Sequence, residues 1–205
     1  MAYNNSVFLN VPFDRSYKRL FEAAVFAVYD CGFIPRSAKE DDDSSTARVE
    51  KIYKLIQESK YGIHDISRVT LDTRNRLPRF NMPLELGIWL GAKRYGSELD
   101  RSKRALVLDK VDHRYQKFCS DISGQDVRSH NNDPSIMIRN VRNWLRNSPD
   151  LRAVAFPGPE KMVERYEQFR ARLRVECRMR GLNLSNLEFN DYASLVVGWL
   201  KINPF

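Results

Sequence analysis

Short apolar runs alternate with amphipathic segments along the first half of the chain. Four of the runs have the character of buried strands: SVFLNVPF (6–13), FIPRSAK (33–39), YGIHDIS (61–67) and RALVLD (104–109). The intervening segments, residues 17–32, 46–60 and 79–94, carry apolar side chains at helical spacing. This alternation predicts a flavodoxin-like α/β fold of three layers, in which helices cover both faces of a parallel sheet.

The second half of the chain is predicted to be mostly helical. Residues 115–135 mix apolar residues with Gly, Asn, Asp and Pro, which indicates a short edge strand and a long loop. Three further helices are predicted, over 135–148, 160–181 and 190–202. A breaker-rich linker (150–161) divides them, so we predict an α/β domain over 1–150 and a C-terminal helical extension over 151–205.

Composition bounds the class of protein. A length of 205 residues suits one domain with an extension. No apolar run approaches the ~18 residues of a membrane span, and the first residues lack the features of a signal peptide, so we expect a cytoplasmic protein without a membrane partner. The three cysteines and three histidines are scattered, which favours reduced thiols and gives no support for a metal site.

The basic charge is concentrated near the C-terminus. The formal net charge is +8, and residues 139–180 alone hold eleven basic against five acidic residues. A basic surface can bind nucleic acid, an anionic ligand or an acidic partner. No RNA-binding signature or zinc finger accompanies it, so we favour a solvated helix face over a nucleic-acid site. The apolar segment 190–202 must pack on the domain or on another subunit, which makes a homo-oligomer an open alternative.

Candidate binding residues lie where the predicted strands end. Ligands of doubly wound sheets bind outside the carboxyl ends of the strands. The residues at these positions are Asn10, Val11, Pro12, Phe13 and Asp14 after the first strand, Arg36 after the second, and Asp65, Ser67 and Arg68 after the third.

The segment RFNMPLELGIWLGAKR (79–94) holds one charged residue, Glu85, between Met82 and Ala92. With Asn81 as N-cap, Glu85 is predicted to lie in the first helical turn and to point toward the same crevice. One interpretation is structural, because an acid in a first turn interacts favourably with the helix dipole by about 0.3–1 kcal/mol. The other is functional, because the surrounding apolar residues predict a mostly buried helix, and a buried carboxylate needs partners or its pKa rises.

Three motifs in order carry a resemblance to known families. VFLNVPFD, then YGIHDIS, then FNMPLELGIWLGAKRYG resemble motifs of the nucleoside 2-deoxyribosyltransferase family and of the related TIR domains that cleave NAD. The resemblance covers roughly residues 7–109. It implies that Glu85 is the catalytic glutamate and that Asp65 contacts the ribose.

The resemblance also implies that Asn10, Pro12 and Phe13 form the loop beside the base. The transferases place an Asp several residues before the glutamate, whereas RLPRFN here offers Arg76, Arg79 and Asn81. This departure favours a phosphorylated nucleotide over a deoxyribonucleoside, because arginines suit phosphate.

The resulting hypothesis is an N-glycosidase-like hydrolase that cleaves the ribose–base bond of NAD or a related nucleotide. Glu85 would be its catalytic residue, Asp65 and Asn81 would orient the ribose, and Arg36, Arg68 or Arg79 would meet phosphate beside Ser67. No cofactor is expected, since NAD would be the substrate. The resemblance further implies control by assembly or a ligand and a role as an effector in antiphage defence. The alternative is a binding module that holds a nucleotide signal intact while its basic helices contact a partner.

Overall fold

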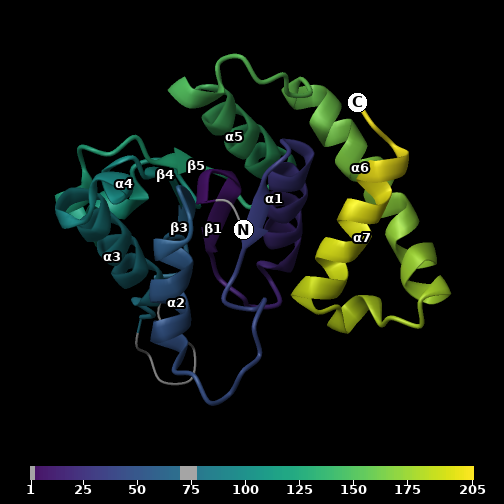
Figure 1. The fold of residues 1–205 in the computed structure, drawn as a ribbon, viewed down its shortest axis with the longest axis horizontal. Coiled ribbons are helices and arrows are strands. Elements are labelled where there is room, and N and C mark those ends of the chain that lie inside the picture. Colours follow the sequence, from purple (N-terminus) through teal and green to yellow (C-terminus); the bar gives the residue numbers. More distant parts are fainter. Residues whose placement is uncertain (1–2, 70–77) are drawn as a thin grey trace.

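The computed structural model describes residues 3–69 and 78–205. Within these residues five strands form one sheet in the order β2-β1-β3-β4-β5, and every pair is parallel (Figure 1). The strands are β1 (Ser6–Asn10), β2 (Ile34–Arg36), β3 (Tyr61–Asp65), β4 (Arg104–Asp109) and β5 (Arg128–Ser129). This is the flavodoxin-like strand order, so the predicted α/β class and parallel sheet are confirmed.

Seven α-helices and five short 3₁₀ turns complete the described ranges. The α-helices are α1 (Lys18–Asp30), α2 (Arg48–Gln57), α3 (Asn81–Tyr95), α4 (Glu98–Arg101), α5 (Pro134–Arg146), α6 (Pro159–Met179) and α7 (Phe189–Ile202). The 3₁₀ turns are η1 (Tyr3–Asn5), η2 (Arg114–Lys117), η3 (Ser120–Ile122), η4 (Pro149–Leu151) and η5 (Leu184–Asn186). None of the helices in the described part of the chain has the length and apolar character needed to cross a membrane.

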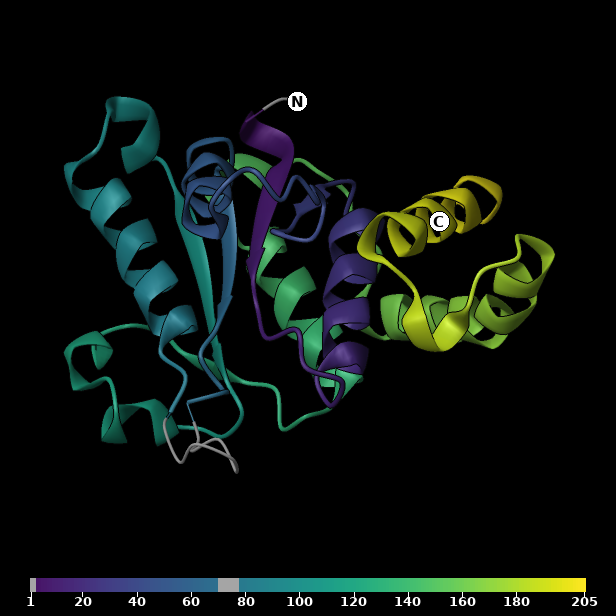
Figure 2. The ribbon, with the colours of Figure 1, turned by 90° about the horizontal axis from the view of Figure 1, so that it is seen from below.

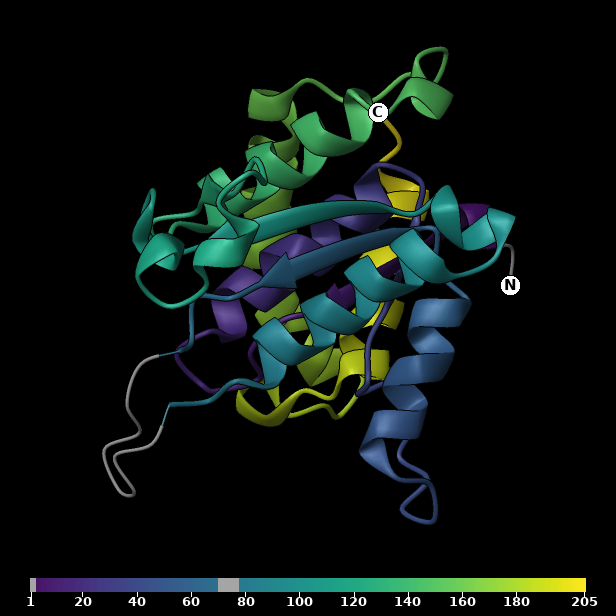
Figure 3. The same ribbon diagram turned by 90° about the vertical axis from the view of Figure 1, so that its left-hand side faces the viewer.

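Side chains alternate between the two faces of the sheet, and this decides which helix each one meets. Leu9 and Ile63 belong to the large core on the side of α1 and α5, whereas Phe8 packs with Trp89 of α3 on the side of α2 and α3. Figure 3 shows α2 and α3 in front of the strands. The predicted coverage of both faces is therefore confirmed.

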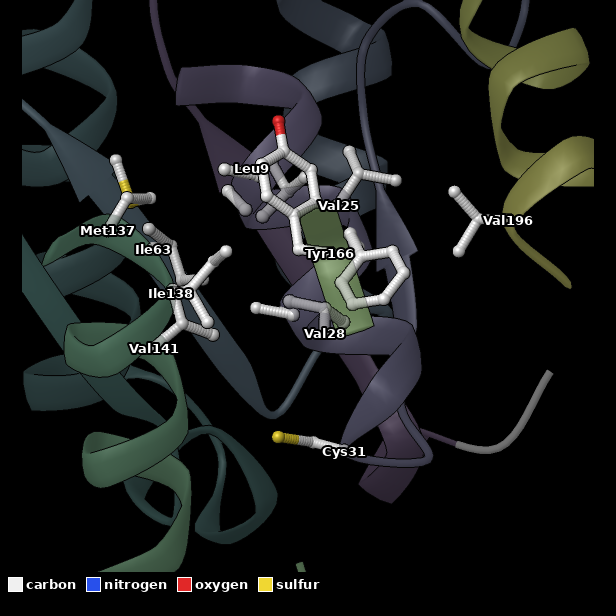
Figure 4. Close-up of a cluster of buried hydrophobic side chains, with 14 of the residues drawn as sticks. Leu9, Val25, Val28, Cys31, Ile63, Met137, Ile138, Val141, Tyr166 and Val196 are labelled. Atoms are coloured by element: carbon white, nitrogen blue, oxygen red, sulfur yellow. The ribbon is translucent and has the colours of Figure 1, made fainter. Parts of the chain in front are cut away.

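Helix α1 is buried on almost all sides. Its residues from Ala23 to Val28 are fully buried, because the sheet, α5 and the C-terminal helices surround it. The close-up in Figure 4 shows Val25 and Val28 of α1 among side chains from the sheet, α5, α6 and α7. The helix stops at Gly32, which takes a φ of +80° while its N–H bonds the Tyr29 carbonyl at 2.8 Å.

The C-terminal helices α6 and α7 form an additional layer beyond α1 (Figure 2). Phe26 of α1 lies 5.5 Å from the Phe169 ring and 5.9 Å from the Trp199 ring. The hydrophobic core thus runs without a break from β1 to α7, across the boundary predicted at residue 150. Near the end of α6, Cys177 packs in this core, whereas Val175 is 51% exposed and faces away from it.

Two predicted helix faces and three helix starts differ from the structure. Helix α3 is not buried all round: among its residues only Glu85, Leu86 and Trp89 are buried, and Leu84 is 62% exposed, because the helix covers the sheet with one face. For α2 the helical spacing predicts a buried face of Val49, Ile52, Tyr53 and Ile56, but the buried residues are Ile52, Leu55 and Ile56, and Val49 and Tyr53 are exposed. Helix α2 begins at Arg48, two residues later than predicted, and α3 is capped by Phe80 instead of Asn81. For α7 the sequence predicts Asn190 or Asp191 as N-cap, but the N-cap is Glu188.

Candidate functional site

A cavity of about 360 Å³ opens at the carboxyl end of β1, between the loop after that strand and the start of α3. Its apolar wall consists of Val11, Pro12, Phe13 and Met82. Its polar wall consists of Asp14, Arg48, Arg68, Arg79 and Asn81. The volume falls in the range of small-molecule sites, about 300–1,000 Å³. Seven of the residues singled out in the sequence are brought together here: Val11, Pro12, Phe13, Asp14, Arg68, Arg79 and Asn81.

Three arginines give the cavity a positive wall. Arg68 lies 3.3 Å from a carboxylate oxygen of Asp14 and donates a 2.7 Å hydrogen bond to the Ser16 hydroxyl, and these two contacts hold its guanidinium in place. Arg48 stacks over Phe13 at 5.4 Å from the ring centroid. Only Asp14 opposes these three guanidinium groups among the lining residues, so the site favours an anionic ligand with an apolar part.

Glu85 lies on α3, next to the cavity residues Asn81 and Met82. It is one helical turn beyond Asn81 and Met82 on α3, so the three residues share one helix face. The residue is 6% exposed, and no hydrogen bond or ion pair from the described residues reaches its carboxylate. Burial raises the pKa of Glu85 to about 7, against an opposing attraction from Arg48.

The predicted dipole role of Glu85 is wrong. Helix α3 begins at Asn81 and has no acidic residue in its first turn, so Glu85 lies too far along the helix to interact with the free N–H groups at its start. The carboxylate therefore pays the cost of burial without a structural partner among the described residues. A carboxyl group with a raised pKa beside a cleft is typical of functional sites.

Asn10 supports the site from behind. Its amide nitrogen donates a 2.9 Å hydrogen bond to the Met82 carbonyl and lies 3.1 Å from Nδ1 of His64, so it fixes the start of α3 to β1. Because Nδ1 accepts from this amide, the His64 proton sits on Nε2. Burial lowers the pKa of His64 to about 3, which keeps the ring neutral. Asn10 is thus placed as an anchor of α3 and does not line the cavity.

Asp65 points to the opposite face of the sheet from Glu85. Its carboxylate accepts a 2.6 Å hydrogen bond from the Tyr17 hydroxyl and a 2.8 Å hydrogen bond from the Ser67 N–H, and it lies 3.0 Å from Nε2 of His130. The Ser67 carbonyl accepts a 2.8 Å hydrogen bond from Arg114. Asp65 and Ser67 are therefore held in a buried network and are not brought into the cavity with Pro12 and Phe13.

Arg36 is also placed elsewhere. Its guanidinium binds both carboxylate oxygens of Glu40 and lies 3.1 Å from Glu58. The residue is 5% exposed and lines a separate hollow between β2 and α2. These partners give Arg36 a structural role, and the structure does not bring it to the candidate site.

Sequence reasoning missed two residues of the site and one of the network. Arg48 opens α2, far from the three motifs, and nothing in its neighbourhood marks it as a cavity residue. Met82 has the ordinary appearance of a core residue. His130 has no motif at all and reaches Asp65 only through the fold. Arg76, considered with Arg79 and Asn81, lies outside the described residues.

Comparison of the chain with protein-family models, with curated proteins and with solved structures finds no match. The geometry of the cavity and of Glu85 is therefore the basis for the functional argument.

Proposed function

We propose that the chain binds a phosphorylated nucleotide in the cavity beside β1 and cleaves its ribose–base bond, with NAD as the candidate substrate and Glu85 as the catalytic carboxylate. One observation carries this proposal: a buried carboxylate without a partner among the described residues lies one helical turn from the lining of a cavity walled by three arginines. In this assignment Arg48, Arg68 and Arg79 meet phosphate, and Pro12, Phe13 and Met82 border the base.

The chemistry needs only one carboxylate. When the bond between the anomeric carbon and the base breaks, its electron pair leaves with the base and positive charge develops on the ribose. Nicotinamide leaves NAD as a neutral molecule because its ring nitrogen is cationic in the substrate, so no second acid is required. Ionised Glu85 stabilises the developing cation or attacks it, and water then supplies the hydroxyl of the product.

The position of Glu85 sets a steric condition. Asn81 and Met82 line the cavity one turn earlier on the same helix, and Glu85 itself does not. A substrate that reaches the carboxylate would therefore contact or displace these two side chains, and the proposal assigns Asn81 to the ribose. Asp65, bound by Tyr17 and His130, is left out of the assignment.

The similarity of the three motifs to TIR domains and deoxyribosyltransferases supports the same proposal, since such domains share a parallel sheet of this kind. Cleavage of NAD would deplete a cofactor of the cytoplasm, so the proposal includes control by self-assembly or by a ligand, as in an antiphage defence effector.

The test is incubation of NAD with wild type, Glu85→Gln and a control variant, Glu167→Gln, at high protein concentration, followed by chromatography of free nicotinamide. Glu167 is exposed on α6, far from the cavity. We expect release by wild type and by the control, and none by Glu85→Gln. Release of nicotinamide by Glu85→Gln at the wild-type rate would show that Glu85 is not the catalytic carboxylate.

A non-catalytic module that binds a nucleotide signal is the second candidate. The observation in its favour is that Asn81 and Met82 line the cavity, whereas Glu85 does not. This second candidate predicts that NAD is recovered intact from wild type, even when a fused oligomerisation tag forces the protein to assemble.

A further inference from the structure

A second cavity, of about 400 Å³, lies between α1 and α6 on the side of the molecule away from α3. Lys18, Arg19 and Glu22 of α1 face Arg170 and Arg174 of α6 across it, and Leu184 of η5 closes one end. Figure 2 shows α1 and α6 next to each other in this region, with the segment that connects α6 to α7 beside them. Four cations thus surround the cavity with a single carboxylate.

The carboxylate does not neutralise these cations. Glu22 is 7% exposed, and its nearest basic group is Lys18, at 3.8 Å. Burial raises the pKa of Glu22, and the nearby Lys18, Arg170 and Arg19 act in the opposite direction.

Lys18 is already used by the fold. Its ammonium group donates hydrogen bonds of 2.8 Å to the Leu184 carbonyl and 3.2 Å to the Ser185 carbonyl, which holds η5 as the end wall. The remaining positive charge belongs to three arginines.

Those three arginines have no acidic partner. No carboxylate of the described residues lies within ion-pair distance of Arg19, Arg170 or Arg174. The Nε of Arg170 is buried and lacks a hydrogen-bond partner there, while its guanidinium lies 5.8 Å from the Tyr166 ring centroid. Unpaired guanidinium groups that share a cavity repel one another, and an anion that accepts from several of them removes this repulsion.

We propose that the α1–α6 cavity is a binding site for the multiply charged phosphate group of a small molecule, such as a nucleoside triphosphate. Guanidinium groups match phosphate geometry through pairs of parallel hydrogen bonds. The site is separate from the cavity beside β1.

Lys18 and Glu22 also line a third cavity, which shares Pro12, Phe13 and Asp14 with the candidate active site. An occupant is therefore placed to act on the loop after β1, and the binding itself does not rest on the proposed glycosidase function.

The test is isothermal titration calorimetry of the full chain with inorganic triphosphate at fixed ionic strength. The test variant is Arg170→Gln/Arg174→Gln. The matched control is Arg172→Gln/Arg178→Gln, which removes the same charge from the same helix at exposed positions outside the cavity. We expect saturable binding that weakens about tenfold or more in the test variant and less than about twofold in the control.

Two outcomes would overturn the proposal. One is the absence of saturable binding to wild type; the other is an equal loss in both variants, which would show diffuse attraction to a basic helix. Thermal unfolding of each variant without ligand verifies that it is folded. Triphosphate should raise the melting temperature of wild type and of the control more than that of the test variant.

Discussion

Tyr17 donates a 2.6 Å hydrogen bond to the buried carboxylate of Asp65, which ties the start of α1 to the end of β3. Removal of the hydroxyl leaves this carboxylate short of one donor in a fully buried site. Tyr17→Phe is expected to lower the free energy of unfolding by about 1–2 kcal/mol, measured by urea denaturation. The control is Tyr95→Phe, since Tyr95 is 85% exposed. Equal stability of the two variants would show that Asp65 does not depend on Tyr17.

The lowered pKa of Asp65 leads us to expect a loss of stability in acid. Burial acts to raise the pKa of Asp65, but contacts with His130, Ser67 and Tyr17 outweigh it, so the pKa lies below its ordinary value. Such a group stabilises the fold fully above the unfolded pKa of about 3.9, and this contribution is lost as the pH falls through the folded value.

Asp65→Asn should therefore show a weaker dependence of stability on pH in this acidic window, measured as urea midpoints between about pH 6 and about pH 2. Asp126→Asn, at a carboxylate that is 92% exposed, should keep the wild-type dependence. An unchanged acid limb in Asp65→Asn would contradict the prediction.

The sheet could be predicted from the sequence, because its strands are short apolar runs at regular intervals. The alternation of side chains also decides that His64 and Asp65 point to opposite faces. The partners of Asp65 could not be predicted: Tyr17 is 48 residues away in sequence, and His130 lies on the short edge segment where the pattern is weakest. Likewise Arg36 was considered for phosphate, but the two glutamates that bind it become its neighbours only after folding.

Helix α3 shows a second limit of prediction from sequence, which concerns the buried face of a helix. Its apolar composition suggested burial on all sides, yet Leu84 is exposed while Glu85 is buried. Composition gives the average polarity of a helix, whereas the phase of the helix on the sheet decides which residues are buried. Glu85 is buried, as the functional interpretation expects, but it lies beyond the first turn, so the expected contact with the helix dipole is absent.

Glu85→Gln is expected to stabilise the protein at alkaline pH. The pKa of about 7 lies above the ordinary value, so the folded chain holds this proton more tightly than the unfolded chain does. Wild type therefore loses stability as the pH rises from about 4.3 through the folded value, and the amide variant does not.

The variant should exceed wild type by about 1–2 kcal/mol at about pH 8, with a smaller difference at about pH 5, in urea denaturation. Glu167→Gln serves as the control and should match wild type at both values. If Glu85→Gln gains stability and loses nicotinamide release, Glu85 is a functional residue whose burial costs the protein stability. No gain at alkaline pH would show that the carboxylate has a compensating partner.

Arg48→Gln should raise the pKa of Glu85 further. Arg48 lines the cavity and is the charge whose attraction opposes the effect of burial on Glu85. The titration is measured by carbon-13 NMR of glutamate carboxyl groups, with the Glu85 signal assigned from Glu85→Gln. The pH profile of nicotinamide release should move to higher pH with it. Arg94→Gln, at the exposed far end of α3, should leave the titration unchanged. An unchanged pKa of Glu85 in Arg48→Gln would show that Arg48 does not influence the Glu85 carboxylate.

A buried ion pair joins α6 to the end of α1. Arg165 of α6 donates from Nη2 to Asp30 at the end of α1 at 2.8 Å, and its Nε lies 3.1 Å from both oxygens of that carboxylate. Arg165→Met leaves Asp30 buried without its partner and is expected to cost about 3–5 kcal/mol, measured by urea denaturation. The double variant Asp30→Leu/Arg165→Met removes both charges and should recover most of this loss, because an apolar pair avoids the cost of burying charge.

The exposed pair of Arg139 and Glu160, joined at 2.7 Å, provides the control for this cycle. Arg139→Met should cost less than about 1 kcal/mol, since solvent screens a pair at the surface. If Arg165→Met costs no more than Arg139→Met, the attachment of α6 rests on its apolar face alone. In that case Tyr166 and Phe169, which are fully buried against α1, would be the residues that hold it.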